Sequence, residues 1–116
     1  MTFWITDWLI AFAITLGVES LVAIPLLKVE PQLLPRAAGV ALANLATHPL
    51  VWFASPGLAL PLGVRIGLAE LFAVIVEGWA YHVIWRQLRV RRGLLISLGA
   101  NACSFLLGLL MRGVFR

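Results

Sequence analysis

The stretch ITDWLIAFAITLGVESLVAIPLL, residues 5–27, decides the fold class of this chain. It is apolar over most of its length and carries two acidic residues, Asp7 and Glu19. A helix needs about 20 mostly apolar residues to cross a bilayer. Backbone polar groups in lipid must bond within their own segment, which favours a helix over an isolated strand. The stretch therefore predicts a transmembrane helix.

Three further apolar segments follow, separated by short connections rich in proline, glycine and charged residues. Residues 28–36 contain two prolines and three charges, and are expected to form a loop. Short connections favour antiparallel neighbours. We therefore expect an all-α integral membrane protein whose residues 1–116 form a single transmembrane domain. The expected fold is an antiparallel bundle of four transmembrane helices, at about residues 5–27, 37–54, 64–85 and 94–111.

The composition excludes several other classes of protein. Of the 116 residues, 62% are hydrophobic and 12% are charged, and the mean hydropathy is +1.00. Soluble domains carry about a quarter charged residues, so an ordinary soluble enzyme is excluded. The single cysteine, Cys103, excludes an internal disulfide and a cysteine-rich zinc site. The net charge of +4 comes from bases between apolar runs, where they anchor helices, so no nucleic-acid partner is expected.

The distribution of lysine and arginine predicts the orientation of the chain. The first and third connections hold six bases, namely Lys28, Arg36, Arg86, Arg89, Arg91 and Arg92. The opposite side holds three bases, namely Arg65, Arg112 and Arg116. The positive-inside rule places the richer side in the cytoplasm, so both termini are expected outside it, across the inner membrane. We expect anionic lipid headgroups to contact Arg86, Arg89, Arg91 and Arg92.

Three of the five acidic residues lie within apolar spans: Glu19, Glu70 and Glu77. A carboxylate near the bilayer centre costs about 2.5–3.5 kcal/mol, and ionisable residues at this depth are functional candidates. Glu70, Glu77 and Tyr81 stand at positions i, i+7 and i+11, which is one stripe of a helix. We therefore expect these acids to face the interior of the bundle.

Polar residues recur at helical spacing on the other segments. Asn44, Thr47 and His48 form such a group in the second segment, and Asn101 lies between Ser97 and Ser104 in the fourth. The two serines are expected to join helices through hydrogen bonds. The asparagines are either part of the binding site or join helices in the same way. His48 is either a hydrogen-bonded structural residue or a metal ligand or proton carrier. The candidate residues for binding a ligand or proton are Glu19, Asn44, Thr47, His48, Glu70, Glu77, Tyr81 and Asn101.

The run Ala43-Asn44-Leu45-Ala46-Thr47-His48-Pro49-Leu50 resembles an Asn-x-x-Thr-x-Pro pattern of small bacterial multi-pass membrane proteins. The acidic third segment with Glu70, Glu77 and Tyr81, and the Ser97, Asn101 and Ser104 pattern, are also similar to that group. The resemblance covers the last three segments and implies a role for these polar positions, but no mechanism. The size, the four spans and Glu19 also look like small multidrug-resistance exporters, although the surrounding motifs differ.

These observations favour a bundle with a buried polar and acidic cluster that binds or translocates a proton, a cation or a small solute. Desolvation favours the neutral form of a carboxyl group, which suits proton coupling. We expect no cofactor. We expect the chain to form a homo-oligomer or to bind a partner membrane protein. One alternative is an accessory subunit that docks to a partner through its polar stripes. Another is a metal-dependent intramembrane enzyme, with ligands from Glu19, His48, Glu70 and Glu77.

Overall fold

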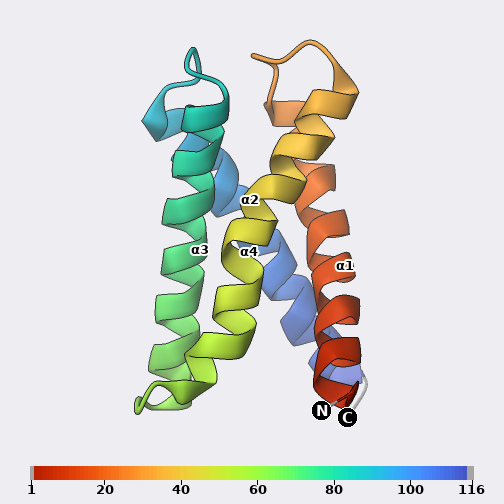
Figure 1. Ribbon diagram of the computed structural model, residues 1–116, viewed down its shortest axis with the longest axis vertical. Coiled ribbons are helices and arrows are strands. Elements are labelled where there is room, and N and C mark those ends of the chain that lie inside the picture. The colour runs from red at the N-terminus through yellow and green to blue at the C-terminus, as the bar shows by residue number, and fades with distance from the viewer. Residues whose placement is uncertain (1, 115–116) are drawn as a thin grey trace.

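The computed structural model describes the backbone of residues 2–114 and the side chains of residues 5–111. Within these residues it contains four long helices and no strand (Figure 1). The helices are α1 (Thr2–Leu26), α2 (Leu33–Ala54), α3 (Leu62–Ile84) and α4 (Val90–Val114), with a 3-10 turn η1 (Ser55–Gly57) after α2. Consecutive helices run in opposite directions, so α1 begins at the end of the bundle where α4 finishes (Figure 1). The predicted all-α four-helix bundle is confirmed.

The dimensions and surface of the bundle suit a membrane. Three segments are long and apolar enough to cross one: Ile5–Leu26, Leu33–Gly57 and Val90–Met111. The remaining helix, α3, packs between α2 and α4. The bundle measures 40 × 25 × 25 Å, and a bilayer with its headgroups is about 40–45 Å thick. Large apolar side chains such as Leu21 and Leu42 are exposed on its outside, whereas Glu19 and Glu77 are buried.

Each helix packs against two neighbours, so the four helices form a ring. α1 packs against α2 and α4, and α3 packs against the same two helices. Within residues 2–114, the diagonal pairs α1–α3 and α2–α4 do not approach closely. This arrangement leaves the axis of the bundle to be filled by side chains, which determines where a polar cavity can form.

Two of the predicted helix boundaries were wrong at the amino-terminal end. α2 begins at Leu33 rather than near residue 37, and α4 begins at Val90 rather than near residue 94. Pro35 therefore lies in the first turn of α2, although residues 28–36 were predicted to be a loop. Proline is tolerated there because the first amide groups of a helix have no carbonyl partner within the helix. Arg91 lies in the first turn of α4, because this helix begins before the predicted start near residue 94.

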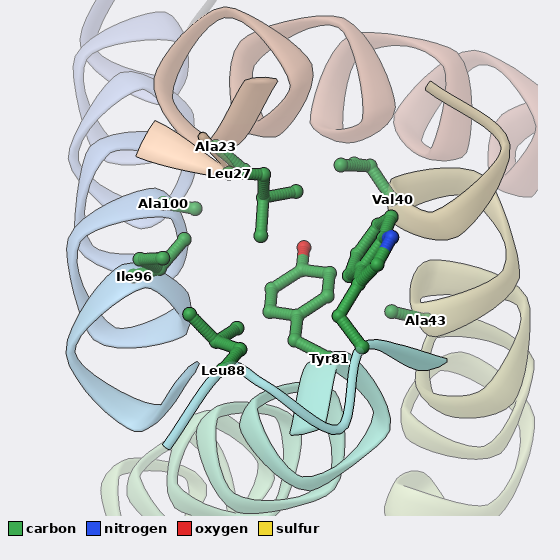
Figure 2. Close-up of a cluster of buried hydrophobic side chains, with 9 residues drawn as sticks. Ala23, Leu27, Val40, Ala43, Tyr81, Leu88, Ile96 and Ala100 are labelled. Carbon is green, nitrogen blue, oxygen red and sulfur yellow. The ribbon is translucent and has the colours of Figure 1, made fainter. Parts of the chain in front are cut away.

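An apolar core fills the end of the bundle that carries the first and third connections. It contains Ala23, Leu27, Val40, Ala43, Tyr81, Trp85, Leu88, Ile96 and Ala100. Figure 2 shows the ring of Tyr81, from α3, in the middle of the labelled side chains, with residues from the other three helices and from the connections around it. This end of the bundle is therefore closed by side-chain packing.

Two glycines allow α3 and α4 to approach each other closely at the same end. A methyl group on Gly78 would lie 2.8 Å from Cα of Leu94, and one on Gly93 would lie 2.6 Å from the carbonyl oxygen of Gly78. Small residues permit such close backbone packing between membrane helices. From this contact the two helices diverge toward the opposite end of the bundle (Figure 1).

Candidate functional site

A polar cavity lies on the axis of the bundle, beyond the apolar core. Its volume is about 120 Å³, enough for several water molecules. All four helices line it, because the ring arrangement turns one face of each toward the axis. The lining residues are Thr15, Glu19, Asn44, Thr47, His48, Val51, Ala69, Glu70, Ala73, Glu77, Asn101, Ser104 and Phe105.

The carboxyl group of Glu77 is held from two sides. Thr47 Oγ1 on α2 donates to Glu77 Oε2 over 2.8 Å, and Asn101 Nδ2 on α4 donates to Glu77 Oε1 over 3.3 Å. The Glu77 side chain is only 1% exposed. One donor for each oxygen fixes the orientation of the carboxyl group, as expected of a buried acid.

Glu19 of α1 faces the same space and is held less completely. Ser104 Oγ donates to Glu19 Oε2 over 3.2 Å, while Glu19 Oε1 is buried and has no hydrogen-bond partner among the described residues. The carboxyl group of Glu77 lies within hydrogen-bonding reach of the Glu19 carboxyl group. Neither carboxylate can donate, so a bond between them forms only when one of them carries a proton.

The two asparagines are anchored by backbone carbonyl groups of their own helices. Asn44 Nδ2 donates to the Val40 carbonyl oxygen over 2.9 Å, and Asn101 Nδ2 donates to that of Ser97 over 2.9 Å. Ser97 Oγ in turn donates to the Val74 carbonyl oxygen of α3 over 2.9 Å. Ser97 thus joins α3 to α4, in line with the packing role predicted for it, and the asparagine side chains are fixed at the cavity wall.

His48 lies at the cavity wall inside a cluster of aromatic rings. The indole of Trp8 donates from Nε1 to His48 Nδ1 over 2.9 Å. Phe12 meets the imidazole edge-on and Trp52 stacks on it, with ring centroids 5.2 and 6.3 Å away. Since an indole can only donate, Nδ1 of His48 is an acceptor and its hydrogen is on Nε2. This environment fits the predicted structural, hydrogen-bonded histidine.

Glu70 lies at the edge of the cavity, seven residues before Glu77 on α3. Glu70, Asn101 and Phe105 line both the cavity and an apolar groove of about 390 Å³ between α3 and α4. Leu71 and Leu98, which line the groove, are more than half exposed. Glu70 therefore stands between the polar interior and the lipid-facing surface, where the two helices diverge.

Tyr81 is the one candidate residue that does not line the cavity. It is fully buried in the apolar core, and its hydroxyl group has no hydrogen-bond partner among the described residues. Tyr81 lies on the same buried face of α3 as Glu77, as predicted, but one turn further along the helix. At that depth the neighbouring helices supply Ala23, Leu27 and Val40 instead of polar groups.

Replacing Tyr81 with phenylalanine should therefore preserve the fold. A buried polar group without a partner costs about 1–3 kcal/mol, and phenylalanine removes the hydroxyl while keeping the ring. We expect the free energy of unfolding in detergent to stay the same or to rise by about 1 kcal/mol. A decrease of more than about 1 kcal/mol in Tyr81→Phe would show that the hydroxyl group has a stabilising partner.

The remaining candidate residues come together as the spacing predicts: Glu19, Asn44, Thr47, His48, Glu70, Glu77 and Asn101 all line the cavity. The candidate set omitted Thr15 and Ser104, which line it as well. Ser104 was assigned to helix packing, yet it also donates to Glu19. The signals for both were present in the sequence, since Thr15 is four residues before Glu19 and Ser104 is three residues after Asn101.

A metal site is not formed by these acids in the described part of the chain. No three His, Cys, Asp or Glu side chains there gather closely enough to hold a metal ion.

Comparisons with protein-family models, with curated proteins and with solved structures gave no match. The site must therefore be interpreted from its own geometry.

Proposed function

We propose that this protein binds a proton or a small monovalent cation in its central cavity and carries it across the membrane. The observation that carries the proposal is the pair formed by Glu19 of α1 and Glu77 of α3, two buried carboxyl groups within hydrogen-bonding reach of each other. Two facing carboxylates repel each other, so the pair is stable when a proton or a cation lies between them.

The surroundings of the pair support binding of a positive charge. Thr47 and Asn101 occupy both oxygens of Glu77 and fix its position. Glu19 Oε1 accepts no hydrogen bond among the described residues, although the Asn44 side chain lies close to the Glu19 carboxyl group, and we propose that this oxygen accepts a proton or coordinates a cation. The lining contains three carboxyl groups and neither lysine nor arginine.

The size of the cavity narrows the range of ligands. A volume of about 120 Å³ accommodates a monovalent cation with a few waters, but most organic solutes are larger. Glu70 provides a third carboxyl group between the Glu19–Glu77 pair and the α3–α4 groove. We propose that Glu70 takes part in loading and release of the charge, while Glu19 and Glu77 hold it at mid-membrane.

We also propose an orientation and an assembly. Six bases lie at the end of the bundle that carries the first and third connections, and they support a cytoplasmic position for that end, with the termini outside, in an inner membrane. Because a single bundle encloses little space, we propose that a homo-oligomer forms the transport unit. The alternative role as an accessory subunit would be favoured by co-purification of a partner in fixed stoichiometry.

The replacement of Glu77 by glutamine tests the proposed function. The amide keeps an oxygen for Asn101, and its nitrogen can donate to Thr47, so the fold is retained. We expect proton or sodium flux into vesicles reconstituted with the full chain to fall at least about tenfold, since the removed charge is worth more than about 1.4 kcal/mol at this site. Flux is measured with a pH-sensitive or sodium-sensitive dye trapped in the vesicles.

Glu30→Gln is the matched control, because Glu30 lies in the first connection, where its Oε1 accepts a hydrogen bond from the amide of Gln32. Its flux should equal that of the unmodified protein. If the unmodified protein conducts no more than protein-free vesicles, or if Glu77→Gln conducts as well as the unmodified protein, the proposed function is wrong.

A further inference from the structure

The two cation-rich connections are held together by the same apolar core. In the first connection the buried Leu27 precedes the exposed Lys28, and in the third the buried Leu88 precedes the exposed Arg89. Both leucines belong to the core cluster (Figure 2). Burial of the two leucines therefore brings cations from distant parts of the sequence to one end of the bundle.

These cations line a common pocket of about 300 Å³. Its charged residues are Lys28, Arg89 and Arg92, and no acidic residue lines it. Its other lining residues are Leu26, Val29, Gln87 and Leu88. Arg86 and Arg91 lie in the same part of the sequence but do not line the pocket. The structure therefore separates the basic side chains that line the pocket from those that do not, a difference that the sequence alone does not show.

Hydrogen bonds hold the backbone on both sides of this pocket. Arg36 donates to the Ile24 carbonyl oxygen over 3.0 Å and to that of Glu30, which joins the start of α2 to the end of α1. His82 Nδ1 donates to the Leu88 carbonyl oxygen over 2.6 Å. The long cationic side chains thus extend from fixed backbone positions, which lowers the entropic cost of binding.

We propose that this pocket binds the phosphate group of an anionic phospholipid. Lysine and arginine side chains form strong charge-assisted hydrogen bonds to phosphate, and the arginine fork can bind two oxygens at once. The pocket lies at one end of a 40 Å bundle, which is the depth of the headgroups. Leu26 and Val29 add apolar surface for the adjoining glycerol and acyl chains, which a free phosphate ion does not have.

This inference is independent of transport through the central cavity. It also differs from a general attraction between the arginine cluster and lipid. A diffuse attraction depends on the number of charges and treats Arg86, Arg89, Arg91 and Arg92 alike. A built pocket depends on Arg89 and Arg92 together with Lys28 from the other connection, and it does not depend on Arg86 or Arg91.

The test compares single substitutions that remove the same charge. The full chain in neutral detergent is titrated with a short-chain phosphatidylglycerol, with the matching phosphatidylcholine and with inorganic phosphate, and binding is measured by native mass spectrometry. The pocket variants are Lys28→Gln, Arg89→Gln and Arg92→Gln, and the controls are Arg86→Gln and Arg91→Gln. All five residues are exposed, so the fold should be retained in each variant.

We expect each pocket variant to weaken phosphatidylglycerol binding by about tenfold or more, and each control by less than about twofold. Phosphatidylcholine should bind at least about tenfold more weakly, because it has no net negative charge. Equal weakening in all five variants would show diffuse electrostatics and overturn the proposal. Inorganic phosphate that binds as tightly as phosphatidylglycerol would show that the lipid is not the ligand.

Discussion

Replacing Gly78 with leucine is expected to separate α3 from α4 and to destabilise the bundle. The first added carbon would lie 2.8 Å from Cα and 3.0 Å from the backbone nitrogen of Leu94. Backbone atoms cannot move aside as the end of a flexible side chain can, so the helices must move apart. This motion opens the core around Tyr81 and Ile96, and we expect a loss of about 3 kcal/mol or more in the free energy of unfolding.

The measurement is thermal or denaturant unfolding in detergent, followed by tryptophan fluorescence, since Trp85 is buried in the same core. Gly17→Leu is the matched control. A methyl group on Gly17 would meet no atom within 4 Å, and the residue is exposed on α1. Leucine favours a helix more than glycine does, so the control should be at least as stable as the unmodified protein. Equal stability of the two leucine variants would contradict the close approach of α3 and α4.

Replacing Glu77 with leucine is expected to stabilise the protein and to abolish its flux. A carboxylate at mid-membrane costs about 2.5–3.5 kcal/mol, and leucine removes that cost. The two donors that contact Glu77 keep other acceptors, since Thr47 Oγ1 also reaches the Ala43 carbonyl oxygen and Asn101 Nδ2 bonds that of Ser97. We expect the free energy of unfolding to rise by about 1–2 kcal/mol, while flux falls to that of protein-free vesicles.

Asn101→Leu provides the opposite case. It removes the donor to Glu77 Oε1 and leaves the buried carboxyl group incompletely satisfied, so a loss of about 1–3 kcal/mol is expected. If Glu77→Leu raises the free energy of unfolding and Asn101→Leu lowers it, Glu77 is a group that is kept for function at a cost in stability. A large loss of stability in Glu77→Leu would instead give Glu77 a structural role.

Much of the site could be predicted from spacing alone. Residues three, four or seven positions apart share a face of a helix, so Glu70 and Glu77, or Asn44 and Thr47, had to point in similar directions. The cost of a carboxyl group in lipid then required those faces to turn inward. His48 was assigned correctly to the polar part of α2, but its aromatic surroundings come from Trp8 and Phe12 on another helix.

Tyr81 shows where this reasoning stops. Its position relative to Glu77 gave the right face of α3, but that position says nothing about what lies opposite at each depth. Ser104 shows the same limit for a residue that was not a candidate for the site. Its hydrogen bond to Glu19 joins α4 to α1, and spacing within α4 does not reveal it. Contacts between helices depend on how far one helix is shifted along another, and no spacing within a single helix contains that shift.

The sequence by itself determined that the chain forms apolar helices, approximately where each lies, and which stripe of each is polar. These properties depend on interactions within one segment and on the cost of moving polar groups into lipid. The tertiary structure alone decided that Gly78 meets Gly93, that Tyr81 lies in the apolar core, and that Lys28 joins Arg89 in one pocket. Each of these results depends on the register and separation of helices that are distant in sequence, and close packing fixes both quantities only when all four helices are assembled.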